Sequence, residues 1–149
     1  MITEDYVSFE TAKLLKEKGF DGICYHAYSF KNGNNKLIGA SLVIEGSVVI
    51  TAKDTNIAAD YYKEEFGFDI EFYLAPTINM AIKWLREVHN QIIIIKYGNA
   101  GFVEESILQW WWELLNTKGE LHACNIVDGN KSYEEACEDS ILYVLKNLI

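Results

Sequence analysis

Two neighbouring segments carry the clearest hydrophobic patterns in this chain. Across residues 78–89, apolar side chains recur every three or four positions on two adjacent stripes, which predicts a helix buried on more than one side. Pro76 cannot continue a strand ladder and Thr77 is a favourable N-cap, so the helix is expected to begin there. Residues 92–95 are four isoleucines, which is typical of a strand covered on both faces.

The two ends of the chain also predict helices. Ser8 is a plausible N-cap for a helix over residues 9–18, and Gly19 supplies the left-handed position that ends it. Near the other end, Ser132 and Glu135 form a capping box. One apolar face then continues to the end of the chain; it contains Tyr133, Ala136, Cys137, Ile141, Val144, Leu145 and Leu148.

The region between these helices is rich in strand and turn signals. Residues 23–29, 37–44 and 47–53 predict a three-stranded antiparallel meander, with Asn32-Gly33 in its first turn and Glu45-Gly46 in its second. Residues 56–66 fit a helix ended by Gly67, but their apolar stripe is ragged and leaves this element open. Residues 69–74 alternate in polarity and predict a short strand.

Residues 104–115 fit both a helix and a strand. The segment 116–119 is Asn-Thr-Lys-Gly, a common hairpin loop in which glycine takes the left-handed position, so it favours the strand. We therefore predict that residues 108–115 pair with residues 120–126. The glycines at 98 and 101 leave this strand room to lie near a sheet edge. Together the elements predict an α+β fold with a single mainly antiparallel sheet, about three helices packed largely on one face, and one domain over residues 1–149.

Composition narrows the classes of function. The chain has 149 residues, 50% of them hydrophobic, which argues against disorder. Its net charge of −9 disfavours binding to nucleic acid, because phosphate backbones are also negative. The apolar runs are too short for a membrane span, and the acidic start of the chain lacks the features of a signal peptide. We expect a cytoplasmic protein with no membrane association.

Three segments resemble one family. They are residues 2–15, Ala75-Pro76-Thr77 with Lys83-Trp84-Leu85-Arg86-Glu87, and residues 132–136. Their combination and order are similar to a family of small uncharacterised proteins from gut bacteria and their phages. The resemblance covers about a third of the chain. It implies a phage or mobile-element setting, and it supplies no established activity and no catalytic residue.

Few side chains suggest chemistry. Cys24 and His26 lie two apart on a predicted strand, and His122 and Cys124 repeat the pattern in reverse, so four ligands for zinc are available if those strands are neighbours. Zinc sites normally have close-set ligands on turns, so we expect neither a metal nor a cofactor. A cysteine–histidine pair for nucleophilic catalysis could be drawn from Cys24, Cys124, His26, His89 and His122, without any enzyme signature around them.

The tryptophan triplet is the strongest candidate for a functional site. On a strand, Trp110 and Trp112 face one side and Trp111 faces the other, beside polar neighbours. An exposed tryptophan on a polar face is a typical anchor for a partner. We therefore predict a non-enzymatic interaction or self-association module, in which Trp110, Trp111 and Trp112 contribute to a homodimer or to a protein partner. The alternative is a small enzyme whose site includes Tyr25, His26, Tyr28 or His122 and is not visible as a linear motif.

Overall fold

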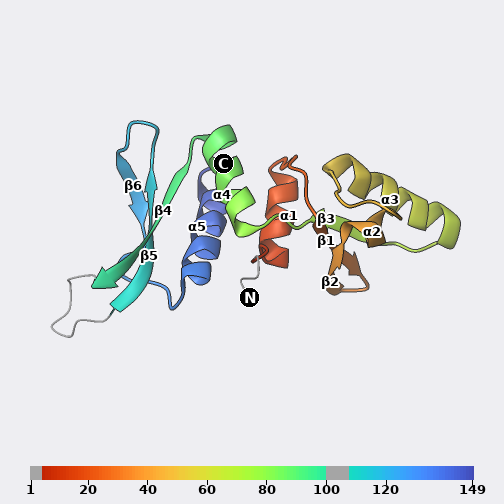
Figure 1. Ribbon diagram of the computed structural model, residues 1–149, viewed down its shortest axis with the longest axis horizontal. Coiled ribbons are helices and arrows are strands. Elements are labelled where there is room, and N and C mark those ends of the chain that lie inside the picture. The colour runs from red at the N-terminus through yellow and green to blue at the C-terminus, as the bar shows by residue number, and fades with distance from the viewer. Residues whose placement is uncertain (1–4, 100–107) are drawn as a thin grey trace. The chain divides into compact units, whose positions relative to one another are not determined.

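The computed structural model describes residues 5–99 and 108–149 (Figure 1). This part of the chain forms five helices and two three-stranded antiparallel sheets, so the α+β class is confirmed. The prediction of a single sheet with three helices is wrong. The chain divides into two compact units, residues 1–80 and 81–149, and each unit contains one of the sheets. One domain over residues 1–149 stays a prediction.

The sheet of the first unit is built around a tight hairpin. Strand β1 (His26–Lys31) pairs with β2 (Asn34–Gly39) through the two-residue loop at Asn32 and Gly33, whose φ angles are 52° and 79°. Asn-Gly suits such a loop because both residues tolerate positive φ. Strand β3 (Glu71–Leu74), from the predicted segment 69–74, pairs with the other side of β1, giving the order β2-β1-β3.

The predicted meander is wrong in its second half. Strand β2 ends at Gly39 and is followed by helix α2 (Ala40–Val43), and Ile50 makes only an isolated bridge to Cys24. Thr51 is instead the N-cap of helix α3 (Ala52–Phe66). The physical reason is a capping box: the Thr51 amide donates to Asp54 Oδ2 at 2.8 Å, and the Asp54 amide donates to Thr51 Oγ1 at 3.4 Å.

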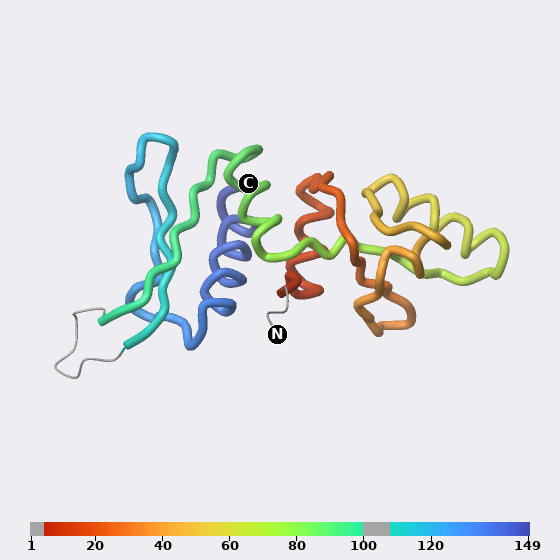
Figure 2. Tube along the Cα trace, viewed as in Figure 1, coloured from red at the N-terminus to blue at the C-terminus, as the bar shows by residue number. Residues whose placement is uncertain are grey.

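The two other helix ends in this unit were predicted correctly. Helix α3 ends at Gly67, which has a φ of 66°, as expected for a left-handed C-terminal position. Helix α1 (Phe9–Glu17) begins after Ser8, whose hydroxyl accepts the Thr11 amide at 3.2 Å. Beyond Gly19, the Phe20 amide donates to the Leu15 carbonyl at 2.9 Å, and both side chains are buried. Figure 2 follows the chain through these elements.

Helix α4 (Ile78–His89) is observed over the predicted residues, with Thr77 Oγ1 accepting the Met80 amide at 3.3 Å. In the second unit, β4 (Ile92–Asn99), β5 (Leu108–Leu115) and β6 (Leu121–Cys124) form a sheet in that order. The strand prediction for residues 108–115 and its hairpin to β6 are therefore confirmed; residues 104–107 and Gly101 lie outside the described residues. The predicted edge position is wrong, because β5 pairs with a neighbour on each side.

Helix α5 (Tyr133–Asn147) lies along one face of this sheet (Figure 1). Ala136, Cys137, Ile141, Val144 and Leu145 are fully buried, whereas Tyr133 and Leu148 at the two ends are exposed. The predicted apolar face is thus confirmed over its central turns. The isoleucines of residues 92–95 are only half-buried, so the expectation of a strand covered on both faces is wrong. Within the described residues of the second unit, α5 covers one face of the sheet and no helix covers the opposite face, which is called the open face below (Figure 1).

Candidate functional site

The tryptophan triplet is divided between the two faces of the second sheet. Trp112 is 3% exposed, and its indole Nε1 donates to Asp139 Oδ2 of α5 at 2.7 Å. Its ring also contacts Tyr143 of α5, with the ring centroids 5.0 Å apart. The Trp110 ring lies 5.5 Å from that of Tyr133, between centroids. Trp110 and Trp112 therefore face α5 and hold it against the sheet, as the alternation predicted.

Trp111 lies on the open face of the sheet, where it is half-buried. Its Nε1 donates to Glu113 Oε1 at 3.3 Å, and Lys96 Nζ lies 2.9 Å from Glu113 Oε2. A Cβ on Gly98 would be 3.7 Å from the Trp111 ring, so this ring covers the glycine of the neighbouring strand. The hydrogen bonds from Lys96 and Trp111 lower the pKa of Glu113. The polar groups around Trp111 are thus partners of one another, and an interface through Trp110, Trp111 and Trp112 stays a prediction.

The four residues considered for zinc are divided between the two units. Cys24 and His26 belong to the first unit, and His122 and Cys124 lie on β6 of the second. Burial raises the pKa of the Cys24 thiol to about 12, which leaves it protonated at neutral pH and a poor nucleophile. Among residues 5–99 and 108–149, no group of three or more His, Cys, Asp or Glu side chains is placed to hold a metal. The expectation of no metal and no cofactor stays a prediction.

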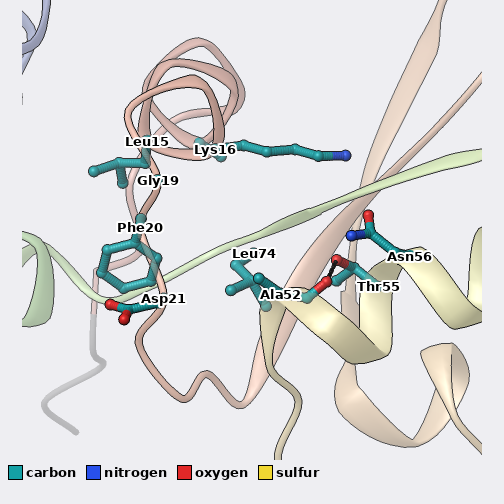
Figure 3. A pocket seen from close by; sticks show the side chains of 10 residues that line it. Leu15, Lys16, Gly19, Phe20, Asp21, Ala52, Thr55, Asn56 and Leu74 are labelled. Carbon is teal, nitrogen blue, oxygen red and sulfur yellow. Dashed lines mark hydrogen bonds between the residues drawn. The ribbon is translucent and has the colours of Figure 1, made fainter.

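A cavity of about 270 Å³ lies in the first unit between α1, the turn that follows it and the first turns of α3 (Figure 3). Its lining is mostly apolar, with Lys16, Asp21, Thr55 and Asn56 as the polar residues. Lys16 Nζ donates to the Phe72 carbonyl at 3.3 Å, and the Thr55 hydroxyl donates to the Ala52 carbonyl at 2.7 Å. Lys16 and Thr55 are therefore already hydrogen-bonded within the protein. The lining of this cavity contains no histidine or cysteine.

A larger groove of about 520 Å³ lies in the same unit between α2 and α3. It is lined by Ser41, Leu42, Val43, Ile44, Glu45, Ile57, Ala58, Tyr61, Tyr62 and Phe66. Four of its large apolar side chains are more than half exposed: Leu42 by 64%, Ile57 by 51%, Tyr61 by 53% and Phe66 by 54%. Contiguous exposed apolar surface of this kind marks binding sites for proteins or ligands.

Sequence reasoning missed this groove for two reasons. Residues 40–44 were assigned to a strand, so the short helix that forms one wall was not predicted. The stripe through Ile57, Tyr61 and Phe66 was noticed, but it was judged only as weak evidence for a helix. The sequence carries no signal for the groove itself, because the burial of Thr55 and Ala58 in place of the large apolar residues of α3 is known only from the structure.

The residues named for an enzyme site are absent from the lining of the two cavities described above. Tyr25, His26, Tyr28 and His122 line neither the cavity beside α1 nor the α2–α3 groove. Tyr28 is used structurally, since its hydroxyl donates to the Val7 carbonyl at 2.8 Å.

No protein-family model matches the chain, and no curated protein or solved structure matches it either. The resemblance to proteins of gut bacteria and phages stays a prediction. In the part of the chain that the structure describes, no helix has the length and apolar character needed to cross a membrane.

Proposed function

We propose that this protein is a non-enzymatic interaction module that binds a protein helix in the α2–α3 groove. The observation that carries the proposal is the exposure of Leu42, Ile57, Tyr61 and Phe66 along one groove of the first unit. The apolar face of a helix is the usual occupant of an apolar groove between helices, and it is anchored by side chains at helical spacing.

The chemistry of the described residues supports binding over catalysis. Catalysis by a nucleophile needs a deprotonated or activated group within hydrogen-bond reach of a base. The thiols of Cys24 and Cys137 are buried, and burial raises the pKa of both. The polar groups of the cavity beside α1 include none of the usual nucleophile–base pairs. The α2–α3 groove offers exposed apolar surface, which suits the binding of another protein.

The setting is part of the proposal. The resemblance of residues 2–15, 75–77, 83–87 and 132–136 implies a protein of phages or mobile elements, acting in the cytoplasm. A net charge of −9 favours protein partners over nucleic acid. A small enzyme remains the competing hypothesis, and no cavity described above favours it.

Site-specific photocrosslinking in host cells tests the proposal. A benzoylphenylalanine is placed at Tyr61, or at Tyr25 as the control, because the two tyrosines are exposed by 53% and 52%. We expect a protein adduct of defined mass from position 61 and none from position 25. Adding Ile57→Glu should remove the adduct, because it puts a charge into the groove. No adduct at position 61, or equal adducts at both positions, would contradict the proposal.

A further inference from the structure

The exposed stripe of α3 carries charges as well as apolar side chains. Lys53, Ile57, Tyr61 and Glu64 follow one another at spacings of four, four and three residues, which places them on one line along the helix. Lys53 and Glu64 thus lie at opposite ends of the same stripe, with the two apolar side chains between them. All four are exposed.

The two charges of the stripe have no ion-pair partner among residues 5–99 and 108–149. The ion pairs found there include Lys83–Glu87, Arg86–Glu87 and Lys96–Glu113, and none involves Lys53 or Glu64. Asp60 lies beside the middle of the stripe, between Ile57 and Tyr61 in the sequence, and not at either end. The stripe is therefore positive at its N-terminal end, negative at its C-terminal end and apolar between.

The stripe is complementary to a second copy of the same stripe that runs in the opposite direction. Ile57 and Tyr61 lie two residues on either side of Ala59, and Lys53 and Glu64 are nearly symmetric about the same point. A two-fold axis near Ala59 would bring Ile57 of one copy onto Tyr61 of the other, and Lys53 onto Glu64. A two-fold interface requires this property, because the same patch must serve on both copies.

We propose that the occupant of the α2–α3 groove is a second copy of this chain, with the two α3 helices packed antiparallel. This inference rests on the proposed function and names its partner. Each copy places Ile57 and Tyr61 in the groove formed by α2 and α3 of the other, and two Lys53–Glu64 ion pairs close the ends. The ion pairs set the direction of the helices, since a parallel arrangement would place like charges together.

Charge-swap variants test the arrangement by sedimentation velocity over a wide range of protein concentration. Lys53→Glu alone leaves two acidic ends on the stripe, and Glu64→Lys alone leaves two basic ends. Each variant should raise the dissociation constant of the homodimer by about tenfold or more, because two attractions become two repulsions. The double variant Lys53→Glu/Glu64→Lys should restore dimerisation, since it exchanges the charges without changing their pairing.

Mixing the two single variants gives the sharpest result. The acidic stripe of one then faces the basic stripe of the other, so a heterodimer should form although neither variant pairs with itself. Lys63→Glu is the matched control, because it makes the same charge change as Lys53→Glu at an exposed position about 100° around the helix from Glu64, and it should leave the dimer intact. Circular dichroism confirms that each variant is folded.

The outcomes separate the two proposals. A wild-type chain that stays monomeric, or single variants that dimerise like the wild type, would overturn the self-association. If the photocrosslinked adduct at Tyr61 then contains another protein, the interaction module stands and only the identity of its partner is wrong. If Tyr61 gives no adduct at all, both proposals fail.

Discussion

The α3 stripe of the first unit and the open sheet face of the second are both apolar surfaces, but they differ in how their charges are used. On the sheet face, Trp111, Lys96 and Glu113 are joined by contacts of 3.3 and 2.9 Å, and Trp111 is half-buried among them. On α3, Ile57 and Tyr61 are about half exposed, and Lys53 and Glu64 have no ion-pair partner among the described residues.

The difference shows which surface has more to gain from a partner. When another protein covers a surface whose polar groups are already bonded to one another, those bonds are either kept or lost, so binding gains no polar contact from them. A surface with unpaired charges beside exposed apolar side chains gains both ion pairs and apolar burial when a partner covers it. An aromatic triplet in a sequence is therefore a weaker sign of an interface than the state of its polar neighbours in the fold.

The largest expected contrast concerns the cysteines. Cys124 is exposed, while Cys24 in the first unit and Cys137 in the second are each 0% exposed. With a maleimide at neutral pH, Cys124 should react at once, and the two buried thiols should react about a thousandfold more slowly, since they must wait for local opening. Mass spectrometry of variants that keep one cysteine each, with alanine at the other two, then measures the opening of each unit separately. A Cys24 that reacts as fast as Cys124 would contradict the burial of Cys24 beside Ile50.

Truncating the core under the sheet should have a large effect on the second unit. Leu145 is 0% exposed, so Leu145→Ala should lower the free energy of unfolding by about 2–5 kcal/mol through the lost contacts and the cavity left behind. All four tryptophans lie in residues 81–149, so urea unfolding followed by tryptophan fluorescence reports on this unit. Leu148→Ala is the control: that side chain is 36% exposed, and its loss should cost less.

The regions predicted correctly from the sequence are those with strong local signals. The bounds of α4, the N-cap serines of α1 and α5, and the hairpin from β5 to β6 follow from periodicity, Ser or Thr caps and a glycine turn. The predicted capping box of α5 is only half formed, because the Glu135 carboxylate accepts the Lys131 amide instead of the Ser132 amide. The start of α3 was missed although its signal was present, because Thr51 and Asp54 have the spacing of a capping box. Residues 47–53 were assigned to a strand on alternation alone.

Local sequence patterns did not predict which strands are neighbours in a sheet. Alternation correctly placed Trp111 opposite Trp110 and Trp112, but it does not say which strands flank β5. The central position of β5 depends on its pairing with β4 on one side and on the hairpin to β6 on the other. Two separate sheets arise because β3 pairs with β1 while β4 pairs with β5. Such pairings between distant residues are fixed by tertiary packing and not by propensity.

Trp111→Glu compares the two surfaces directly. The new carboxylate lies two residues from Glu113 on the same face, so we expect a folded protein that is less stable by about 1–3 kcal/mol. Its sedimentation should match the wild type if association runs through α3. If this variant abolishes dimerisation while Ile57→Glu does not, the interface is the sheet face predicted from the tryptophan triplet. Trp111→Phe, which removes the hydrogen bond without adding a charge, is the matched control.

The smallest effect concerns the ion pair on the sheet face. The hydrogen bond from Lys96 holds the pKa of Glu113 below its ordinary value of about 4.5. A lowered pKa in the folded state means that the contribution to stability is fully present above the ordinary value and is lost as the pH falls through the lowered one. Because Lys96 is 45% exposed, the contribution should stay within about 1 kcal/mol.

Glu113→Gln should therefore be slightly less stable than the wild type at neutral pH, and the difference should vanish in acid. A difference between Glu113→Gln and the wild type that persists unchanged below the lowered pKa would mean that Glu113 acts through packing, and the polar groups around Trp111 would then not be held together by charge.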